Sequence, residues 1–357
     1  MTTDKLNAIV YCEGSFNTAN GKTTHGLVRF SQRYRILSVI DSKYPGKDSG
    51  MILDGKSNNI PIVKDLDAAF QLSKNESKTI SEFIVGLAPD GGRLPQSALQ
   101  VIKDALKLGM NIISGLHDFI SEDEELVVLA RKRGGRLFDI RKPPEKNSLH
   151  FFSGKIEQVD SLKIALLGTD SAVGKRTTAW VLNDVFKAAG YTSEMIGTGQ
   201  TAWLQGAKYS IVLDSLVNDF VSGEIEHAVY EAWKNENPDV IILEGQGSLL
   251  NPAYPGGFEL LAAGRPDLVI LQHAPRRIYY DGFPGYRIQQ LSHQIQAIEI
   301  ISGTEVRAIT LNHEGMKKDE ISRECKKILK ETGVPAFDVL ENGAGELVDL
   351  LKPELIK

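Results

Sequence analysis

Short apolar runs alternate along the chain with stretches whose apolar residues recur at helical spacing. The first half contains six such runs, which we expect to be strands: residues 8–12, 35–41, 60–63, 82–88, 111–116 and 137–140. Between them, residues 94–109 are the clearest helix, because Leu99, Ile102 and Leu106 share a face and Gly109 ends it. This alternation is typical of parallel sheets covered by helices.

The second half repeats the pattern after a polar stretch that begins at Pro143 and Pro144. We expect strands at 163–168, 193–197 and 240–247, and three more in "DLVILQHAP", "VRAITLNHEG" and "VPAFDVL". Helices are expected at 175–189 and 217–233, and a loop in "TGQTAWLQGAKYS". The sequence therefore predicts an α/β protein with two domains, 1–148 and 161–357, joined by a linker at 149–160.

Composition narrows the classes of partner. The chain has 357 residues, 42% of them apolar, which is enough for two cores. A formal net charge of −5 without long basic runs argues against nucleic acid or an anionic membrane surface. Cys12 and Cys325 are the only cysteines, so we expect neither a disulfide framework nor a zinc site. With no leader pattern and no long apolar run, we expect a cytoplasmic protein that acts on a small molecule.

The stretch "GTDSAVGKRTTAW" (168–180) resembles a phosphate-binding loop with two changes. Five residues, not four, separate its glycines, and Arg176 stands where Ser or Thr usually follows the lysine. A strand that feeds a helix here would aim backbone N–H groups and the positive helix end at one point. We expect the following residues to bind a phosphate-bearing cofactor: Gly168, Thr169, Gly174, Lys175, Arg176, Thr177 and Thr178. The alternative is an ordinary glycine-rich turn with a solvated lysine.

An acidic residue follows a later apolar strand, in "DVIILEGQG", where P-loop proteins place the carboxylate that handles magnesium. Together with "GTDSAVGK", this segment resembles the dethiobiotin synthetase branch of P-loop proteins. In that branch a threonine after the lysine ligates magnesium, whereas arginine cannot ligate a cation. Arg176 could instead neutralise a diphosphate itself. Thr177 could reach a metal if the loop shifts by one residue.

A closer resemblance covers almost the whole chain. Seven blocks occur in order: "GKTTHGLVRF", "GTDSAVGKRTTAW", "GTGQTAWLQG", "VLDSLVNDFVSGEIE", "ILEGQGSLLNPAY", "QHAPRRIYYDGFPGY" and "ITLNHEG". They resemble the D-glutamate N-acetyltransferase family, long catalogued as a domain of unknown function. The resemblance implies a Rossmann-like N-terminal domain, a P-loop-like C-terminal domain, acetyl-CoA as donor and an amino acid as acceptor. We also expect a homo-oligomer.

Acetyl transfer to an amine needs a base and donors for the developing oxyanion. Glu244 is our first candidate for the base and Asp170 the second. Ser248, with the amides of Gly245 and Gly247, could contribute to an oxyanion site. The alternatives are a magnesium-water carboxylate for Glu244 and a tight turn for the glycines. A rival class is therefore an ATP- and Mg²⁺-dependent ligase or kinase of the dethiobiotin synthetase type, or a nucleotide-binding regulator.

Polar residues that follow other strands could bind the acceptor. His273, Arg276 and Arg277 could clamp a carboxylate, since ligands in open α/β sheets lie at the carboxyl ends of strands. Gln200 and Thr201 could line the acceptor pocket. The alternatives are a solvated basic loop and a packing histidine.

The first half offers a weaker signal for a ligand. Gly21-Lys22-Thr23 repeats the chemistry of a phosphate loop, and Asp41 ends a strand, but no G-x-G-x-x-G is present. Either this domain receives part of CoA, or it is a rigid structural domain.

Overall fold

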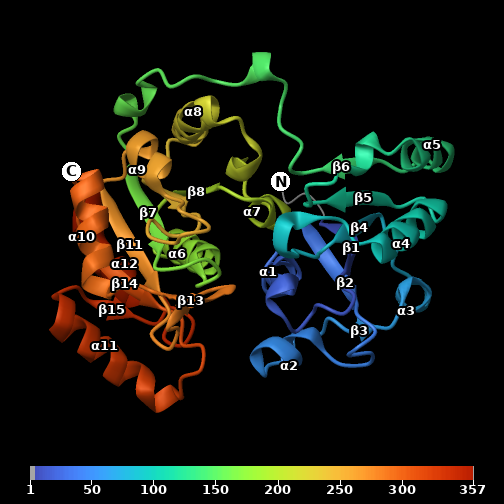
Figure 1. Ribbon diagram of the computed structural model, residues 1–357, viewed down its shortest axis with the longest axis horizontal. Helices are drawn as coiled ribbons and strands as arrows, with labels where there is room; N and C mark the ends of the chain where they lie inside the picture. The colour runs from blue at the N-terminus through green and yellow to red at the C-terminus, as the bar shows by residue number, and fades with distance from the viewer. Residues whose placement is uncertain (1–4, 357) are drawn as a thin grey trace. The chain divides into compact units, whose positions relative to one another are not determined.

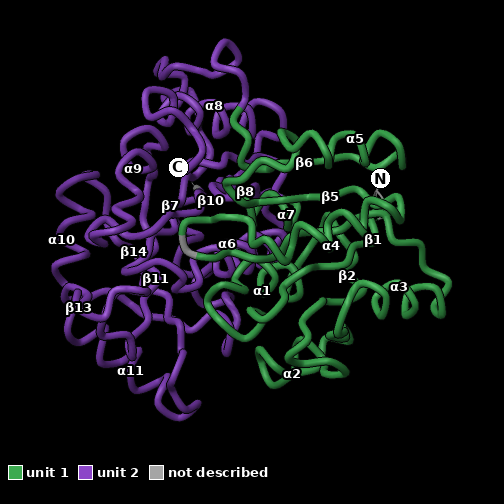
Figure 2. Tube along the Cα trace, turned by 45° about the vertical axis from the view of Figure 1, so that its right-hand side comes forward, with its two compact units in different colours: residues 1–143, 200–206 green, residues 144–199, 207–357 purple. Residues whose placement is uncertain are grey.

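The computed structural model describes residues 5–356, which form two compact units (Figure 2). The first unit contains the chain up to Pro143 together with residues 200–206. The second unit contains residues 144–199 and 207–357. The chain therefore leaves the second unit at Gln200, contributes seven residues to the first, and returns at Ala207.

The first unit is a six-stranded parallel sheet in the order β3-β2-β1-β4-β5-β6 (Figure 1). Its strands are β1 (Leu6–Tyr11), β2 (Tyr34–Ile40), β3 (Ile62–Val63), β4 (Glu82–Val85), β5 (Asn111–Ser114) and β6 (Leu137–Asp139). Its helices are α1 (Lys22–Arg29), α2 (Ser49–Asp54), α3 (Leu66–Asn75), α4 (Gln96–Lys107), α5 (Glu124–Arg133) and α7 (Gln200–Gln205). This strand order is that of the Rossmann fold, with the reversal between β1 and β4.

The second unit is a seven-stranded parallel sheet in the order β15-β14-β11-β7-β10-β8-β9. Its strands are β7 (Leu162–Gly168), β8 (Ser193–Gly197), β9 (Tyr209–Ser210), β10 (Val240–Glu244), β11 (Leu268–His273), β14 (Val306–Leu311) and β15 (Ala336–Phe337). Its helices are α6 (Lys175–Ala188), α8 (Asn218–Glu236), α9 (Phe258–Gly264), α10 (Leu291–Ser302), α11 (Lys318–Thr332) and α12 (Gly345–Leu351). The strand that feeds the phosphate loop is central, since β7 lies between β11 and β10.

A separate antiparallel hairpin, β12 (Tyr279–Tyr280) and β13 (Phe283–Arg287), follows β11.

The segment of chain that connects the two sheets is held to α8 by a buried carboxylate. Glu226 accepts hydrogen bonds from the amide and hydroxyl of Ser153 and from the amide of Ile156. The stretch predicted as a linker is thus packed on a helix of the second unit.

The predicted α/β class with parallel sheets is confirmed, and β7, α6 and α4 lie within two residues of their predicted bounds. The prediction of an uninterrupted loop in "TGQTAWLQGAKYS" is wrong, because residues 200–205 form α7. Leu204 of this helix is fully buried in the core of the first unit. The side-chain amide of Gln205 donates to the carbonyl oxygens of Gly26 and Phe30. These contacts explain why seven residues leave the second unit.

Candidate functional site

The loop predicted to bind phosphate joins β7 to α6. Gly168 is the last residue of the strand and Lys175 is the first residue of the helix. Gly174 has a φ of 106°, which residues with side chains rarely adopt. A Cβ on Gly168 would lie 2.8 Å from the Nζ of Lys175, so glycine leaves room for the lysine. The shape of the loop therefore requires both glycines of the motif.

The Lys175 ammonium is buried and donates hydrogen bonds to the backbone. Its Nζ donates to the carbonyl oxygens of Asp170 and Gly247, both at 2.7 Å. Burial lowers the pKa of Lys175 to about 8, although the charges of Asp170 and Glu244 oppose that shift. Lys175 is therefore still mainly a cation at neutral pH, and an anion in the loop would compete with two carbonyl oxygens for it.

The first amides of α6 form the other half of this site. Within residues 5–356, the backbone N–H groups of Val173, Gly174 and Lys175 donate to no other residue. The N-terminus of a 14-residue helix such as α6 carries partial positive charge. Donors without acceptors, at a positive helix end and beside a lysine, suit a phosphate group.

Glu244 ends β10, the strand beside β7. Its side chain is buried, and its Oε2 accepts from the Thr198 amide at 2.9 Å. Burial raises the pKa of Glu244, and the charge of Arg176, the Thr198 amide and the charge of Lys175 partly offset the rise. The carboxylate is thus placed to balance two cations of the loop. Removal of a proton by Glu244 stays a prediction.

The three threonines of the motif differ in what they contact. The Thr169 hydroxyl lies 3.0 Å from Nδ1 of His273, and the Thr178 hydroxyl donates to Oε1 of Gln272 at 2.6 Å. Both therefore fix the loop to β11. The half-buried Thr177 hydroxyl makes no hydrogen bond to another part of the chain that the structure describes. Thr177 is the threonine of the motif whose hydroxyl is left for a ligand.

Asp170 connects the loop to two other segments. Its carboxylate is fully buried. Oδ1 accepts from the side-chain amide of Asn251 at 2.9 Å, and Oδ2 accepts from the amide of Asp281 at 2.8 Å and from Nη1 of Arg277 at 3.1 Å. A carboxylate with donors on both oxygens is suited to hold loops in place. Asp170 as a base stays a prediction.

The two arginines after β11 are bound to acidic partners, whereas His273, the last residue of that strand, contacts Thr169. Arg277 also donates from Nη1 to the carbonyl oxygen of Ser171 and from Nη2 to Glu314. Arg276 pairs with Glu320, and its side chain is 51% exposed. Burial lowers the pKa of His273 to about 4, so its ring is neutral at physiological pH. Of these three, Arg276 has the partner that a substrate carboxylate could most readily replace, because exposed ion pairs contribute little.

Gln200 and Thr201, predicted to line the acceptor pocket, belong to α7 and therefore to the first unit. The Thr201 hydroxyl lies 3.2 Å from the Thr23 hydroxyl, and Gly115 lies against the Gln200 side chain. The phosphate-loop residues, His273, Arg276 and Arg277 all belong to the second unit. The structure thus divides the predicted site residues between the two units.

Two amides of the turn after β10 donate hydrogen bonds within the protein. The Gly245 amide donates to the carbonyl oxygen of Leu166, and the Ser248 amide donates to that of Tyr254. These two amides are therefore engaged within the protein, which favours a structural turn. Ser248 as a catalytic residue stays a prediction.

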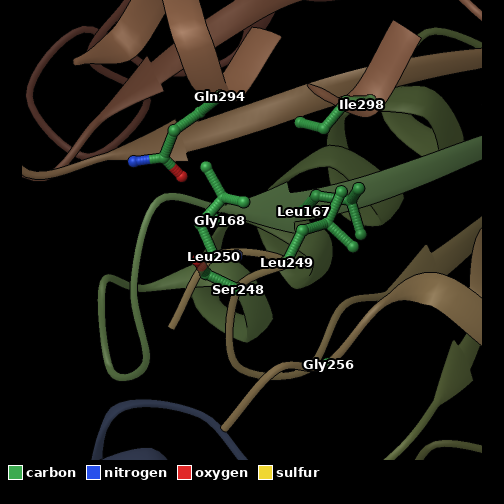
Figure 3. A pocket seen from close by; sticks show the side chains of 8 residues that line it. All are labelled: Leu167, Gly168, Ser248, Leu249, Leu250, Gly256, Gln294 and Ile298. Carbon is green, nitrogen blue, oxygen red and sulfur yellow. Dashed lines mark hydrogen bonds between the residues drawn. The ribbon is translucent and has the colours of Figure 1, made fainter. Parts of the chain in front are cut away.

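A small cavity is lined in part by Gly168, the first glycine of the loop (Figure 3). The volume open to the centre of a water molecule is about 10 Å³, so the cavity has room for roughly one water. Gln294 and Ile298 of α10 approach it from one side, and Gly168 and Ser248 from the other. The space is too small for a substrate, so it does not extend the site.

Residues around the Gly21-Lys22-Thr23 segment make hydrogen bonds within the first unit. Both the amide and the hydroxyl of Thr24 donate to the carbonyl oxygen of Gly86, which caps the start of α1. Asp41 is fully buried and accepts from the amides of Phe16 and Lys43. Asp41 holds the loop after β1 and is not exposed to a ribose.

Sequence reasoning missed a histidine and aspartate pair in the second unit. Nδ1 of His313 lies 2.6 Å from Oδ2 of Asp338. The histidine follows β14 and the aspartate follows β15, at the carboxyl ends of adjacent strands. The position of His313 just after the strand in "ITLNHEG" was the one available signal.

Among the described residues, no three His, Cys, Asp or Glu side chains lie together in a way that could hold a metal ion. No helix within residues 5–356 combines the length and the apolar character needed to cross a membrane.

The chain matches both domains of one protein family. The P-loop domain of DUF1611, a domain of unknown function, matches residues 150–348, and its Rossmann-like N-terminal domain matches residues 42–143. The predicted pairing of a Rossmann-like with a P-loop domain is thereby confirmed.

Two curated relatives named D-glutamate N-acetyltransferase are similar to this chain. The protein from a Pseudoalteromonas species is 32% identical over 273 residues, which cover 74% of this chain and 80% of the relative. The protein from Tritonibacter scottomollicae is 30% identical over 274 residues, covering 75% and 80%. A crystal structure of a DUF1611 family protein from Anabaena variabilis, 28% identical, superimposes with a TM-score of 0.89 over 98% of this chain and 100% of that one.

Proposed function

Because this chain belongs to the DUF1611 family and resembles two D-glutamate N-acetyltransferases, we propose that it is an N-acetyltransferase that uses acetyl-CoA. Its acceptor is an acidic amino acid of the D-glutamate type. The relatives support the reaction, since they align with about three quarters of this chain. The names of these relatives suggest the donor and the acceptor, and the chemistry of the site supports both.

One observation supports a phosphate-bearing donor. The amides of Val173, Gly174 and Lys175 lack acceptors within the described chain and lie beside a lysine ammonium. CoA carries a diphosphate and a 3′-phosphate, which such donors bind without any need to cleave them. The residues present therefore fit this group, with Arg176 supplying a guanidinium in place of a metal. Acetyl-CoA supplies an acetyl group activated as a thioester.

The acceptor side rests on Arg276. An acidic amino acid brings two carboxylates, and arginine binds a carboxylate with two parallel hydrogen bonds. The Arg276 guanidinium is half exposed in its pair with Glu320, so a substrate carboxylate can replace that partner at little cost. Arg277 keeps its place on Asp170 and Glu314.

A second candidate function is an ATP- and Mg²⁺-dependent ligase or kinase. It is favoured by the Thr177 hydroxyl, which faces no partner in the described chain, and by Glu244 on the strand beside β7. A hydroxyl and a carboxylate so placed are the usual magnesium contacts of P-loop enzymes. A nucleotide-binding regulator would use the same loop without chemistry.

The test is incubation of the full chain with acetyl-CoA and D-glutamate, with mass spectrometry of the products. We expect N-acetyl-D-glutamate and CoA in equal amounts, and weaker or no reaction with neutral amino acids. Thermal shifts with acetyl-CoA, CoA and Mg-ATP identify the ligand, because a ligand that binds only the folded state stabilises it. Stabilisation by Mg-ATP alone, with phosphate release and no acetylation, would replace the transferase with the ATP-dependent enzyme.

A matched pair of lysine variants tests the phosphate loop itself. Lys175→Ala should weaken CoA binding by about 1.5–3 kcal/mol, the range for hydrogen bonds to charged groups. Lys187, an exposed lysine in the last turn of the same helix, is the control, and Lys187→Ala should leave the affinity unchanged. Equal affinities for both variants by calorimetry would mean that the loop is only a turn.

A further inference from the structure

His313 and Asp338 form a pair in which a buried carboxylate holds a partly exposed imidazole. The Asp338 side chain is fully buried, whereas 35% of the His313 side chain is exposed. The two residues meet across 25 positions of sequence, at the ends of the adjacent strands β14 and β15. The ring is therefore held by the interior of the second unit while part of it stays accessible.

The other oxygen of Asp338 is also fixed. Oδ1 accepts from the amides of Leu340 and Glu341, at 3.1 and 3.0 Å. An ionised carboxylate only accepts hydrogen bonds, so the 2.6 Å contact with Nδ1 of His313 requires a proton on Nδ1. In the neutral ring, Nε2 then carries the lone pair. Within the described residues, that nitrogen has no hydrogen-bond partner.

Both chain neighbours of His313 are connected to the phosphate loop. The Asn312 amide donates to the carbonyl oxygen of His273, whose ring contacts Thr169 of the loop. Glu314 accepts from Arg277, which donates to Ser171 of the loop. His313 thus lies at the same carboxyl edge of the sheet as the loop, where open α/β sheets bind ligands.

We propose that His313 is the proton acceptor of the acetyl transfer and that Asp338 is its positioning residue, an inference that rests on the proposed N-acetyltransferase function. The acceptor reacts as its free amine, after its ammonium has lost one proton to solvent. Its nitrogen forms a bond to the thioester carbonyl carbon while the C–S bond breaks. Nε2 of His313 takes the proton that the nitrogen sheds and returns it to the leaving thiolate of CoA.

Two other candidates for this role are less suited to it. Glu244 is 4% exposed, accepts from Thr198 and faces the charges of Arg176 and Lys175. His273 contacts Thr169 through Nδ1, and burial lowers its pKa to about 4, which makes it a weak base. His313 is the histidine at this edge whose orientation is fixed by a carboxylate and whose second nitrogen is left for a substrate.

The kinetic experiment uses two variants of His313 and one control. His313→Asn keeps a donor for Asp338 but has no basic nitrogen, so it should fold and lose about 10²- to 10⁴-fold in kcat, the usual contribution of a positioned base. Its affinity for acetyl-CoA should stay within twofold. His313→Ala should lose as much and regain activity with added imidazole. His293→Ala, an exposed histidine on α10, should match the wild type.

A second readout does not depend on acetyl transfer. In ¹⁵N-histidine NMR spectra of the unliganded protein, the neutral His313 ring should carry its proton on Nδ1. In Asp338→Asn this preference should weaken or reverse, because an amide can donate to Nδ1. A wild-type ring protonated on Nε2 would overturn the proposal, and so would a folded His313→Asn with wild-type kcat. A wild-type protein that transfers no acetyl group would instead overturn the proposed function, and the role of His313 with it.

Discussion

Nη1 of Arg277 donates to Oδ2 of Asp170 at 3.1 Å, in a pair whose carboxylate is fully buried and whose arginine side chain is 17% exposed. The pair joins the segment after β11 to the phosphate loop. Since Arg277 also binds Glu314, one guanidinium connects three segments of the second unit. The sequence predicts that Arg277 binds substrate, whereas these contacts indicate that it holds segments of the protein together.

Replacing Arg277 should destabilise the protein strongly. Arg277→Met leaves the buried Asp170 carboxylate without its paired guanidinium, and breaking a buried pair on one side costs about 3–5 kcal/mol. Arg276→Met removes an exposed pair with Glu320 and should cost about 0–1 kcal/mol. Urea unfolding of both variants checks the difference. Equal losses of stability in the two variants would mean that the contact of Arg277 with Asp170 contributes little to the stability of the protein.

A substitution at Leu204 tests whether α7 folds as part of the first unit. Leu204 is fully buried in that unit's core, so Leu204→Ala should cost about 2–5 kcal/mol. Hydrogen exchange should speed up at amides of β1 and β2, because their core is shared with this leucine. Leu329→Ala, at a leucine that is 47% exposed, should change stability by less than about 0.5 kcal/mol. Unchanged exchange in β1 and β2 would place residue 204 outside their cooperative unit.

His273 should make stability depend on pH in the acid range. Its pKa falls from 6.5 to about 4 on folding because of burial. Between these values the unfolded chain binds more protons, so stability is complete above the unfolded pKa and is lost as the pH falls toward 4. The loss attributable to this group is about 3 kcal/mol. His273→Gln should lose correspondingly less stability than the wild type over the same range, measured by urea unfolding. Parallel profiles would show that the ring titrates normally.

Local spacing was sufficient to predict the phosphate loop but not what surrounds it. The strand end, both glycines and the helix start all fall within residues 168–180, so short-range patterns predict them. The partners of Asp170 lie 81, 107 and 111 positions away, and no local pattern marks such contacts. The pairing of His313 with Asp338 could not be predicted from local sequence for the same reason, because the adjacent parallel strands β14 and β15 bring the two residues together.

The missed helix has a different cause. The segment of α7 spans six residues, which is less than two helical turns, so its apolar residues cannot show a helical period. Its flanking residues Gly199 and Gly206 favour a loop by composition. What makes it helical is burial of Leu204 and the hydrogen bonds of Gln205 in the first unit. Tertiary contacts that the sequence does not display decide this element.

Arg176 should make ligand binding independent of metal. Because a guanidinium and backbone donors already neutralise a diphosphate, acetyl-CoA should bind the wild-type protein equally well with and without EDTA. Arg176→Thr restores the residue that magnesium-dependent relatives place after the lysine. That variant should bind more weakly and gain affinity from Mg²⁺, most clearly with ATP.

Calorimetric titrations with acetyl-CoA and ATP, each with Mg²⁺ or EDTA, separate the two outcomes. Arg176→Lys is the matched control, because it keeps the positive charge and offers no metal ligand, so its binding should stay independent of Mg²⁺. If the wild-type protein released its ligand in EDTA, the guanidinium would not replace a metal. In that case the Thr177 hydroxyl and Glu244 would be the better candidates for a magnesium site, and the ATP-dependent enzyme would become the preferred function.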